Sequence, residues 1–160
     1  MIPYLSISSL LSLLTAVVLL AAYSYLDIRN RHVPNSAALF GGAFALAVVI
    51  LSGHLLAQPL LHLSAVIFVP MLSYFLFRIG AFGGADVKIL SVVAIASPGF
   101  ELLELDNPLF ESILSAGIQM LFMLLGGYLY ARTVRNHANS PPLIPFFLLG
   151  YLTIQILSMA

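Results

Sequence analysis

Two aspartates, Asp27 and Asp86, have the residue type and position that most directly indicate chemistry in this 160-residue chain. Each lies at the end of an apolar segment, where an ionisable side chain is costly to bury and is therefore a functional candidate. Two carboxyl groups held a few ångströms apart share a proton, because both cannot easily ionise. One member can then take a proton from water while the other donates to a peptide carbonyl oxygen. The chemistry that such a pair predicts is hydrolysis of a peptide bond.

Each aspartate also has a purely structural interpretation. Asp27 can pair with Arg29 or Arg31, and Asp86 follows Gly83-Gly84-Ala85 as an ordinary helix N-cap would. The two aspartates are 59 residues apart, so their spacing alone does not bring them together. Whether they meet depends on the elements that position them.

The composition predicts that these elements lie in a membrane. Apolar residues make up 61% of the chain and charged residues 8%, whereas a soluble domain has about 25% charged residues. A formal net charge of zero leaves no general basic patch for nucleic acid. The absence of cysteine excludes disulfides, thiolate zinc sites and cysteine nucleophiles. We expect one membrane-embedded domain over residues 1–160, whose first segment is a membrane helix because no positive n-region precedes it.

Apolar runs of spanning length predict an all-α polytopic membrane protein with about six transmembrane helices. The fourth run is short, since about 13 helical residues cover about 20 Å and the hydrocarbon core is about 30 Å thick. Either residues 100–105 extend this helix, or its start lies below the membrane surface and places Asp86 slightly inside the bilayer. The predicted spans are about 3–26, 36–57, 59–77, 87–99, 111–131 and 142–159.

The positive charges predict the orientation of the bundle. With six spans, every lysine and arginine falls in loops on one side, which the positive-inside rule assigns to the cytoplasm. Both termini then lie outside, as does the acidic loop after the fourth span, which we interpret as a solvated cap. Asp27 and Asp86 share the cytoplasmic side. The positive residues are Arg29, Arg31, Arg78, Lys88, Arg132 and Arg135, and the acidic loop holds Glu101, Glu104, Asp106 and Glu111.

Three segments resemble motifs of the prepilin peptidases, the type IV leader peptidase family. In the first motif an aspartate closes the first core helix before a basic loop and a Pro-Asn turn, as in Asp27-Ile28-Arg29-Asn30-Arg31-His32-Val33-Pro34-Asn35. The second motif, Gly-x-Gly-Asp followed by x-Lys-Leu, is similar to Gly83-Gly84-Ala85-Asp86-Val87-Lys88-Ile89-Leu90. The third is a Pro-Phe element that opens the last helix, and it resembles Ile144-Pro145-Phe146. The matches occur in order and cover about residues 27–150.

This resemblance implies an aspartic membrane endopeptidase that cuts the leader from type IV pilin-like precursors at the cytoplasmic face of the cell membrane. Asp27 and Asp86 match its catalytic pair, and no metal or cofactor is implied. Without cysteines or a long cytoplasmic loop, the chain resembles the short form, which serves Flp/Tad-type pilins or archaeal flagellin-like precursors and performs no methylation. One departure is Ala85 in place of the second motif glycine, which would be strained if that position needs a positive φ.

Further residues are candidates for supporting the two aspartates, Asp27 and Asp86. Gly83 and Gly84 would let a substrate backbone approach closely. Lys88 either guides an acidic substrate residue or tunes Asp86, or it is a positive-inside anchor. Pro34 and Asn35 are expected to open the second helix, with support of Asp27 as a secondary role.

Two alternatives to this reading stay open. His54 and His62 flank Pro59 without a nearby carboxylate in the sequence, so we interpret them as interfacial histidines rather than metal ligands. The chain could also be a non-enzymatic membrane component, such as a small carrier or a pilus-assembly scaffold, including an inactive peptidase relative that has lost function through Ala85. A carrier requires polar groups near the middle of the membrane, and the predicted span interiors hold almost none.

Overall fold

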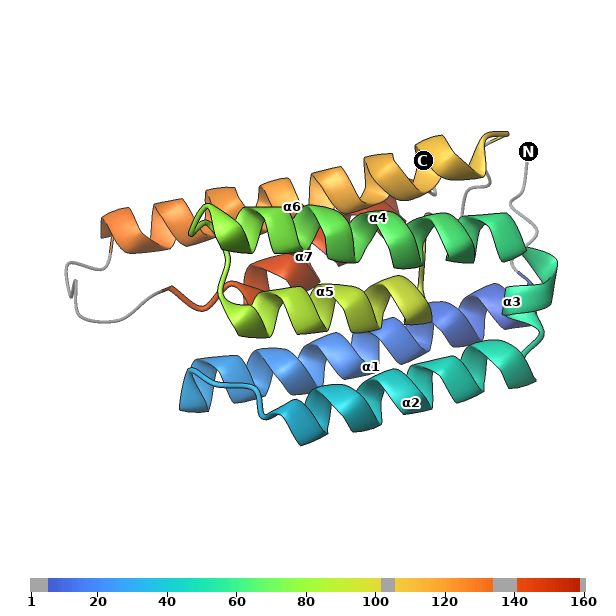
Figure 1. The fold of residues 1–160 in the computed structure, drawn as a ribbon, viewed down its shortest axis with the longest axis horizontal. Helices are drawn as coiled ribbons and strands as arrows, with labels where there is room; N and C mark the ends of the chain where they lie inside the picture. Colours follow the sequence, from blue (N-terminus) through green and yellow to red (C-terminus); the bar gives the residue numbers. More distant parts are fainter. Residues whose placement is uncertain (1–5, 102–105, 134–140, 159–160) are drawn as a thin grey trace.

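Seven helices form the described part of the chain in a computed structural model, which describes residues 6–101, 106–133 and 141–158. No strand occurs within these ranges. The helices run roughly antiparallel along one long axis (Figure 1). They are α1 (Ile7–Asn30), α2 (Asn35–Leu51), α3 (His54–Ala57), α4 (Pro59–Arg78), α5 (Gly84–Ala96), α6 (Pro108–Thr133) and α7 (Ile144–Leu157).

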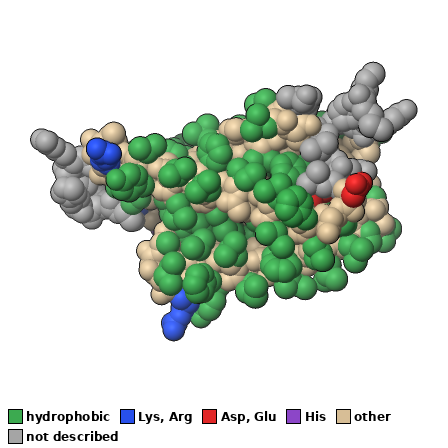
Figure 2. Space-filling view, turned by 90° about the horizontal axis from the view of Figure 1, so that it is seen from above, with side chains coloured by type: hydrophobic (Ala, Val, Ile, Leu, Met, Phe, Trp, Pro, Cys, Tyr) green, Lys and Arg blue, Asp and Glu red, His purple; other side chains and the backbone are tan. Residues whose placement is uncertain are grey.

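The apolar character of these helices is that of a polytopic membrane protein, which confirms the predicted all-α membrane class. By length and composition α1, α4 and α6 can each cross a membrane, and α2 and α7 are shorter apolar helices. Large apolar side chains cover the outward surface (Figure 2). Polar side chains turn inward instead, and the buried hydroxyls of Ser64, Ser73 and Ser112 donate to carbonyl oxygens one turn earlier in their own helices.

Helix α5 lies at the centre of the bundle, where it packs against α1, α2 and α4. Its apolar residues Ile89, Leu90 and Val93 are almost completely buried. A helix that is apolar on most of its faces is expected to be covered by others. Helix α7 packs against α1 and α6 and completes the wall around the core. The shortest of the predicted spans is therefore the most enclosed one.

The predicted C-terminal ends of the first two spans differ from those of the observed helices. The span predicted at 36–57 is interrupted, since α2 ends at Leu51 and a turn with Gly53 at φ +76° precedes the single turn α3. Glycine adopts this left-handed conformation without strain, so it ends a helix readily. The first span was expected to end near residue 26, but α1 continues to Asn30 and ends at Arg31, whose φ is 52°. Asp27 therefore lies within the last turn of α1.

Charge is divided between the two ends of the bundle. The described lysines and arginines lie where α1, α4 and α6 end and α5 begins, together with Asp27 and Asp86. The other described acidic residues, Glu101, Asp106 and Glu111, lie at the other end, and Figure 2 shows blue and red side chains at opposite ends. The acidic segment is not the solvated cap that we predicted, because Glu101 and Glu111 are only 8% and 3% exposed. Asp106 is exposed, whereas Glu104 and Arg135 lie outside the described residues.

Candidate active site

A cavity of about 620 Å³ opens at the end of the bundle that carries the positive charges, and both aspartates line it. Asp27 comes from the last turn of α1 and Asp86 from the first turn of α5. Both side chains are buried, and they lie close enough for their charges to interact. The structure thus brings together two carboxyl groups that are 59 residues apart in the sequence.

Asp27 is held by the start of α7. Its Oδ2 accepts a hydrogen bond from the Ile144 backbone N–H at 3.2 Å. Ile144 is the first residue of α7, whose initial N–H groups have no partner within the helix. A helix N-terminus carries a partial positive charge that stabilises a carboxylate. The contact fixes the Asp27 side chain on a different element from the one that carries it.

Asp86 is held by the start of its own helix. It is the third residue of α5, and its Oδ2 accepts the Gly83 backbone N–H at 2.7 Å. The N-cap position itself belongs to Gly83, so the interpretation of Asp86 as an ordinary N-cap is wrong by three residues. Reaching back to the N-cap N–H is the role of an acidic residue at this position in a capping box. Each carboxyl group therefore accepts a backbone N–H at a helix N-terminus.

The motif around Asp86 fits its local geometry. Ala85 is the second residue of α5, and among the described non-glycine residues only Arg31 has a positive φ. Alanine is therefore unstrained where the family motif has glycine. A Cβ atom at Gly83 would lie 3.2 Å from Asp86 Oδ2, whereas one at Gly84 would meet only Phe77 at 4.0 Å. Of the two glycines, Gly83 is the one whose missing side chain matters for the carboxyl group.

Positive side chains border the cavity. Arg31 and Lys88 both line it, and Arg31 is close enough to Asp27 for their charges to interact. The Lys88 ammonium group donates to Asn35 Oδ1 at 2.5 Å and so links α5 to the first residue of α2. Pro34 is the N-cap of α2, which confirms the predicted helix start, but neither Pro34 nor Asn35 lines the cavity.

One wall of the cavity was missed by the sequence interpretation. Pro141 and Leu143 precede α7 and line the cavity. Their close approach to α6 depends on Gly127, where a Cβ atom would lie 2.4 Å from Leu143 Cδ2. The exposed His32 also lines the cavity. The match of Ile144-Pro145-Phe146 to a family motif was the available signal for this wall.

The two histidines set aside above lie at the opposite end of the bundle, where they are buried inside the protein. His54 and His62 are 1% and 3% exposed, and the Nδ1 atom of His54 lies 2.8 Å from Nε2 of His62. The expected absence of a nearby carboxylate is also wrong, because Glu101 Oε2 is 3.1 Å from His54 Nε2. Among the described residues, no three His, Asp or Glu side chains are arranged to hold a metal ion.

Comparison with known proteins agrees with the geometry of this cavity. Searches of curated proteins and of solved structures found no significant match to the chain. The sequence pattern of the type IV leader peptidase family, in contrast, matches residues 13–159. That range contains both cavity aspartates, the glycine segment and the start of α7. Because the match spans nearly the whole chain, the protein belongs to the type IV leader peptidase family.

Proposed function

We propose that the protein is an aspartic endopeptidase that removes the leader peptide of type IV pilin-like, Flp-type precursors at the cytoplasmic face of the cell membrane. One observation carries this proposal: Asp27 and Asp86 reach the same cavity from α1 and α5, and each is oriented by a helix N-terminus. The family supplies the reaction class, cleavage of a leader.

In the proposed mechanism the two carboxyl groups share one proton. The ionised member takes a proton from a water molecule, which attacks the carbonyl carbon of the scissile peptide bond. The protonated member donates its proton to the carbonyl oxygen as the tetrahedral intermediate forms. When the intermediate breaks down, the proton that was taken from water passes to the leaving amine, and the carboxyl group that gave up its proton recovers one from the intermediate. The hydrogen bonds from Ile144 and Gly83 keep both carboxyl groups in place throughout. No covalent enzyme intermediate is needed.

The proposed orientation follows from the charges at the cavity end. Arg29, Arg31, Arg78, Lys88 and Arg132 lie at this end, and the positive-inside rule assigns such an end to the cytoplasm. In this orientation the chain crosses the membrane six times and both termini lie outside. The apolar helix of a precursor would reach the cavity from the bilayer, with its scissile bond at the membrane surface.

A carrier function is less well supported, because buried apolar side chains interrupt the polar ones midway along α1. On α1, Ala16 and Leu20 lie between Ser12 and Asp27, and both are completely buried. No acidic or basic side chain lies between Ser12 and Asp27 on α1, whereas an ion pathway uses such groups. The idea of an inactive peptidase relative rested on Ala85, and this residue occupies an ordinary helical position.

The test is co-expression of the protein with an Flp-type pilin precursor, followed by measurement of the fraction of precursor that is cleaved. We expect Asp27→Asn and Asp86→Asn each to lower the cleavage rate by about 10²–10⁴-fold, the range over which positioned acids and bases act. Asp106→Asn makes the same chemical change at an exposed site on the opposite end, so this variant should cleave the precursor at the parent rate. Normal cleavage by either cavity variant would refute the proposed pair.

A further inference from the structure

An apolar groove follows the seam between α6 and α7 on the outside of the bundle, and the proposed peptidase chemistry does not use it. Its larger part has a volume of about 690 Å³ and is lined by side chains such as Leu125, Leu129 and Leu149. A smaller hollow of about 170 Å³ continues it, because Phe122 and Thr153 line both parts. We call the two parts together the seam groove.

The lining of the seam groove suits an occupant without charge. Among its described lining residues none is acidic or basic. The hydroxyl groups of Thr133 and Thr153 are already used, because each donates to a carbonyl oxygen of its own helix. The three leucines of the larger part are each more than half exposed. In a membrane these side chains need an apolar neighbour from outside the bundle.

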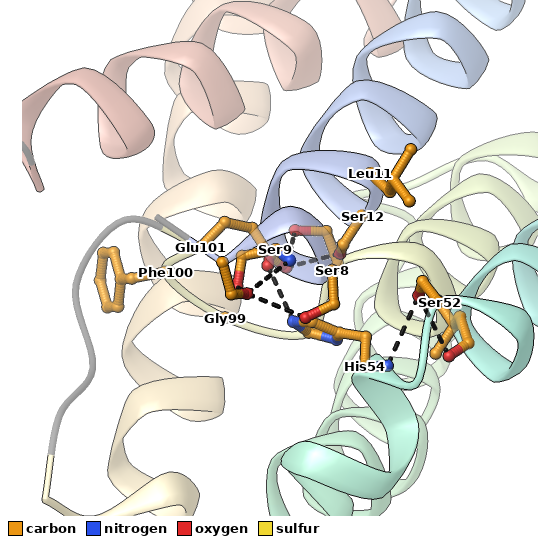
Figure 3. Close-up of polar contacts among 12 residues, drawn as sticks. Ser8, Ser9, Leu11, Ser12, Ser52, His54, Gly99, Phe100 and Glu101 are labelled. Carbon is orange, nitrogen blue, oxygen red and sulfur yellow. Dashed lines mark hydrogen bonds and ion pairs between the residues drawn. The ribbon is translucent and has the colours of Figure 1, made fainter. Parts of the chain in front are cut away.

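Polar contacts on the opposite face of α7 hold this wall of the groove in place. The Tyr151 hydroxyl donates to Ser97 Oγ at 2.8 Å, and the Gln155 side chain accepts the Glu101 backbone N–H at 3.0 Å. Phe100 points away from the polar contacts around Glu101 (Figure 3) and lines the smaller part of the groove. The groove is therefore formed by the packing of the bundle before anything occupies it.

The seam groove meets the proposed catalytic cavity at one end. Arg31 lines the cavity and donates a hydrogen bond of 3.3 Å to the hydroxyl of Tyr130, which lines the groove. The Tyr130 ring packs edge-on against Phe146, with the ring centroids 6.4 Å apart. Phe146 lies two residues after Ile144, whose backbone N–H holds Asp27. A chain that follows the groove toward this end is thus brought beside Asp27.

The length of the seam groove distinguishes a helix from a lipid chain. Its lining extends along α6 from Ile118 to Thr133, which is a rise of about 22 Å. The hydrocarbon core is about 30 Å thick, so one leaflet supplies acyl chains over about 15 Å. One acyl chain would leave part of the groove empty, whereas a membrane helix fills its whole length. Because helices in lipid associate through close packing, a concave surface is favoured over a convex one.

We propose that the seam groove binds the apolar helix of the pilin-like precursor and so aligns its scissile bond with the two cavity aspartates. This inference rests on the proposed function and names the surface that recognises the substrate. The precursor helix lies along α6 and α7 with its leader end at Tyr130, and the extended segment beyond that end enters the cavity past Arg31. Recognition then depends on the helix, and the aspartates contact only the peptide at its end.

Cysteine cross-linking tests this placement, because the chain has no cysteine of its own. Leu149→Cys places a thiol in the groove, and Met71→Cys is the matched control on α4, since the two parent side chains are 56% and 60% exposed. Each variant is co-expressed with Flp-type precursors that carry a single cysteine at successive positions of the apolar helix, and isolated membranes are oxidised.

We expect Leu149→Cys to form several-fold more disulfide with the precursor than Met71→Cys does. The yield should peak every three or four positions along the precursor, because one face of a helix lies in the groove. Equal yields for the two variants, or a yield without this period, would overturn the proposal. Cross-linking measures binding alone, so it can fail while Asp27→Asn and Asp86→Asn still abolish cleavage. Failure of this inference is thereby distinguished from failure of the proposed function.

A substitution that fills the groove gives a second readout. Thr153→Phe puts a ring where the two parts of the groove meet, and Thr153→Val keeps the side-chain volume as the matched control. We expect Thr153→Phe to raise the KM for the precursor about tenfold with little change in kcat, because it removes binding remote from the reacting atoms. Thr153→Val should keep the parent KM. Equal KM values for the two variants, or a fall in kcat alone, would contradict the docking site. If Thr153→Phe does not fold, cross-linking still decides the question.

Discussion

The backbone N–H of Ile144 lies 3.2 Å from Oδ2 of Asp27 and joins two residues that are 117 positions apart. This contact makes the position of one proposed catalytic carboxyl group depend on where α7 begins. Asp86 has a local support instead, the Gly83 N–H three residues before it. The two carboxyl groups therefore depend on different parts of the fold. Substitutions remote from the cavity that displace α7 are expected to move the Asp27 carboxyl group and to leave that of Asp86 in place.

The first prediction concerns the two neighbouring glycines before Asp86. Gly83→Ala places a Cβ atom 3.2 Å from Asp86 Oδ2, so the carboxyl group must shift by a few tenths of an ångström. Because misplacement by 1 Å costs about 10²-fold in rate, we expect about tenfold slower precursor cleavage. Gly84→Ala meets only a Phe77 atom at 4.0 Å and should have a smaller effect. Equal cleavage rates for the two variants would count against this role of Gly83.

The second prediction concerns the contact between Lys88 and Asn35. Asn35→Ala removes the oxygen that holds the Lys88 ammonium group at the cavity, and Asn35→Asp keeps an acceptor there. We expect several-fold slower cleavage for the alanine variant and near-parent cleavage for the aspartate variant. Because the contact is exposed, the free energy of unfolding should change by less than about 1 kcal/mol in both variants. A loss of stability that parallels the loss of activity would instead indicate a purely structural role.

The third prediction tests the packing of α6 on α7. A Cβ atom at Gly126 would lie 2.3 Å from the Phe146 ring, whereas one at Gly117 on the same helix meets nothing within 4 Å. We expect Gly126→Ala to destabilise the protein by about 1–3 kcal/mol, as overpacking does. It should also slow cleavage, because Phe146 lies two residues after the Ile144 N–H donor.

Gly117→Ala is the control for that measurement. Alanine favours helix formation over glycine, so this variant should be neutral or slightly more stable when unfolding is followed by circular dichroism in detergent. If the two alanine variants unfold alike, the close contact between Gly126 and Phe146 does not hold α7 in place.

The fourth prediction is a coupling between α1 and α2. Tyr23 donates a hydrogen bond to the Ala37 carbonyl oxygen, and a Cβ atom at Gly41 would overlap its hydroxyl group. Gly41→Ala should cost about 1–3 kcal/mol of stability, and Tyr23→Phe about 0.5–1.5 kcal/mol. The double variant should lose at least about 0.5 kcal/mol less than the sum, because removing the hydroxyl relieves the overlap. Additive losses would place the two residues too far apart to interact.

The sequence predicted the helices well and their polar contacts poorly. Long apolar runs such as Pro59–Arg78 gave boundaries close to those observed, because spanning a bilayer requires an uninterrupted apolar helix. The 36–57 prediction failed because hydropathy averages over a single glycine, whereas Gly53 breaks the helix through its backbone conformation.

The candidate site was predictable only in part, for a related reason. Asp27 and Asp86 stand out because carboxylates are rare in apolar segments. The support of Asp27 by Ile144 is a backbone contact, and no side-chain pattern encodes it. Glu101 was misread as solvated because its partners, Ser12 and His54, are far away in the sequence and individually unremarkable. Burial of a polar group is a property of the assembled helices, which local patterning does not report.

The shortness of α5 connects the proposed catalysis to the lipid around the protein. A helix of 13 residues is about 10 Å shorter than the hydrocarbon core, and such a mismatch is relieved when the surrounding bilayer thins or water descends beside the protein. The depth of water above Asp86 then depends on the acyl chains of the host membrane. Longer chains would carry the aspartates further from the aqueous phase and slow hydrolysis, so that membrane thickness becomes a means of setting the rate at which precursors mature.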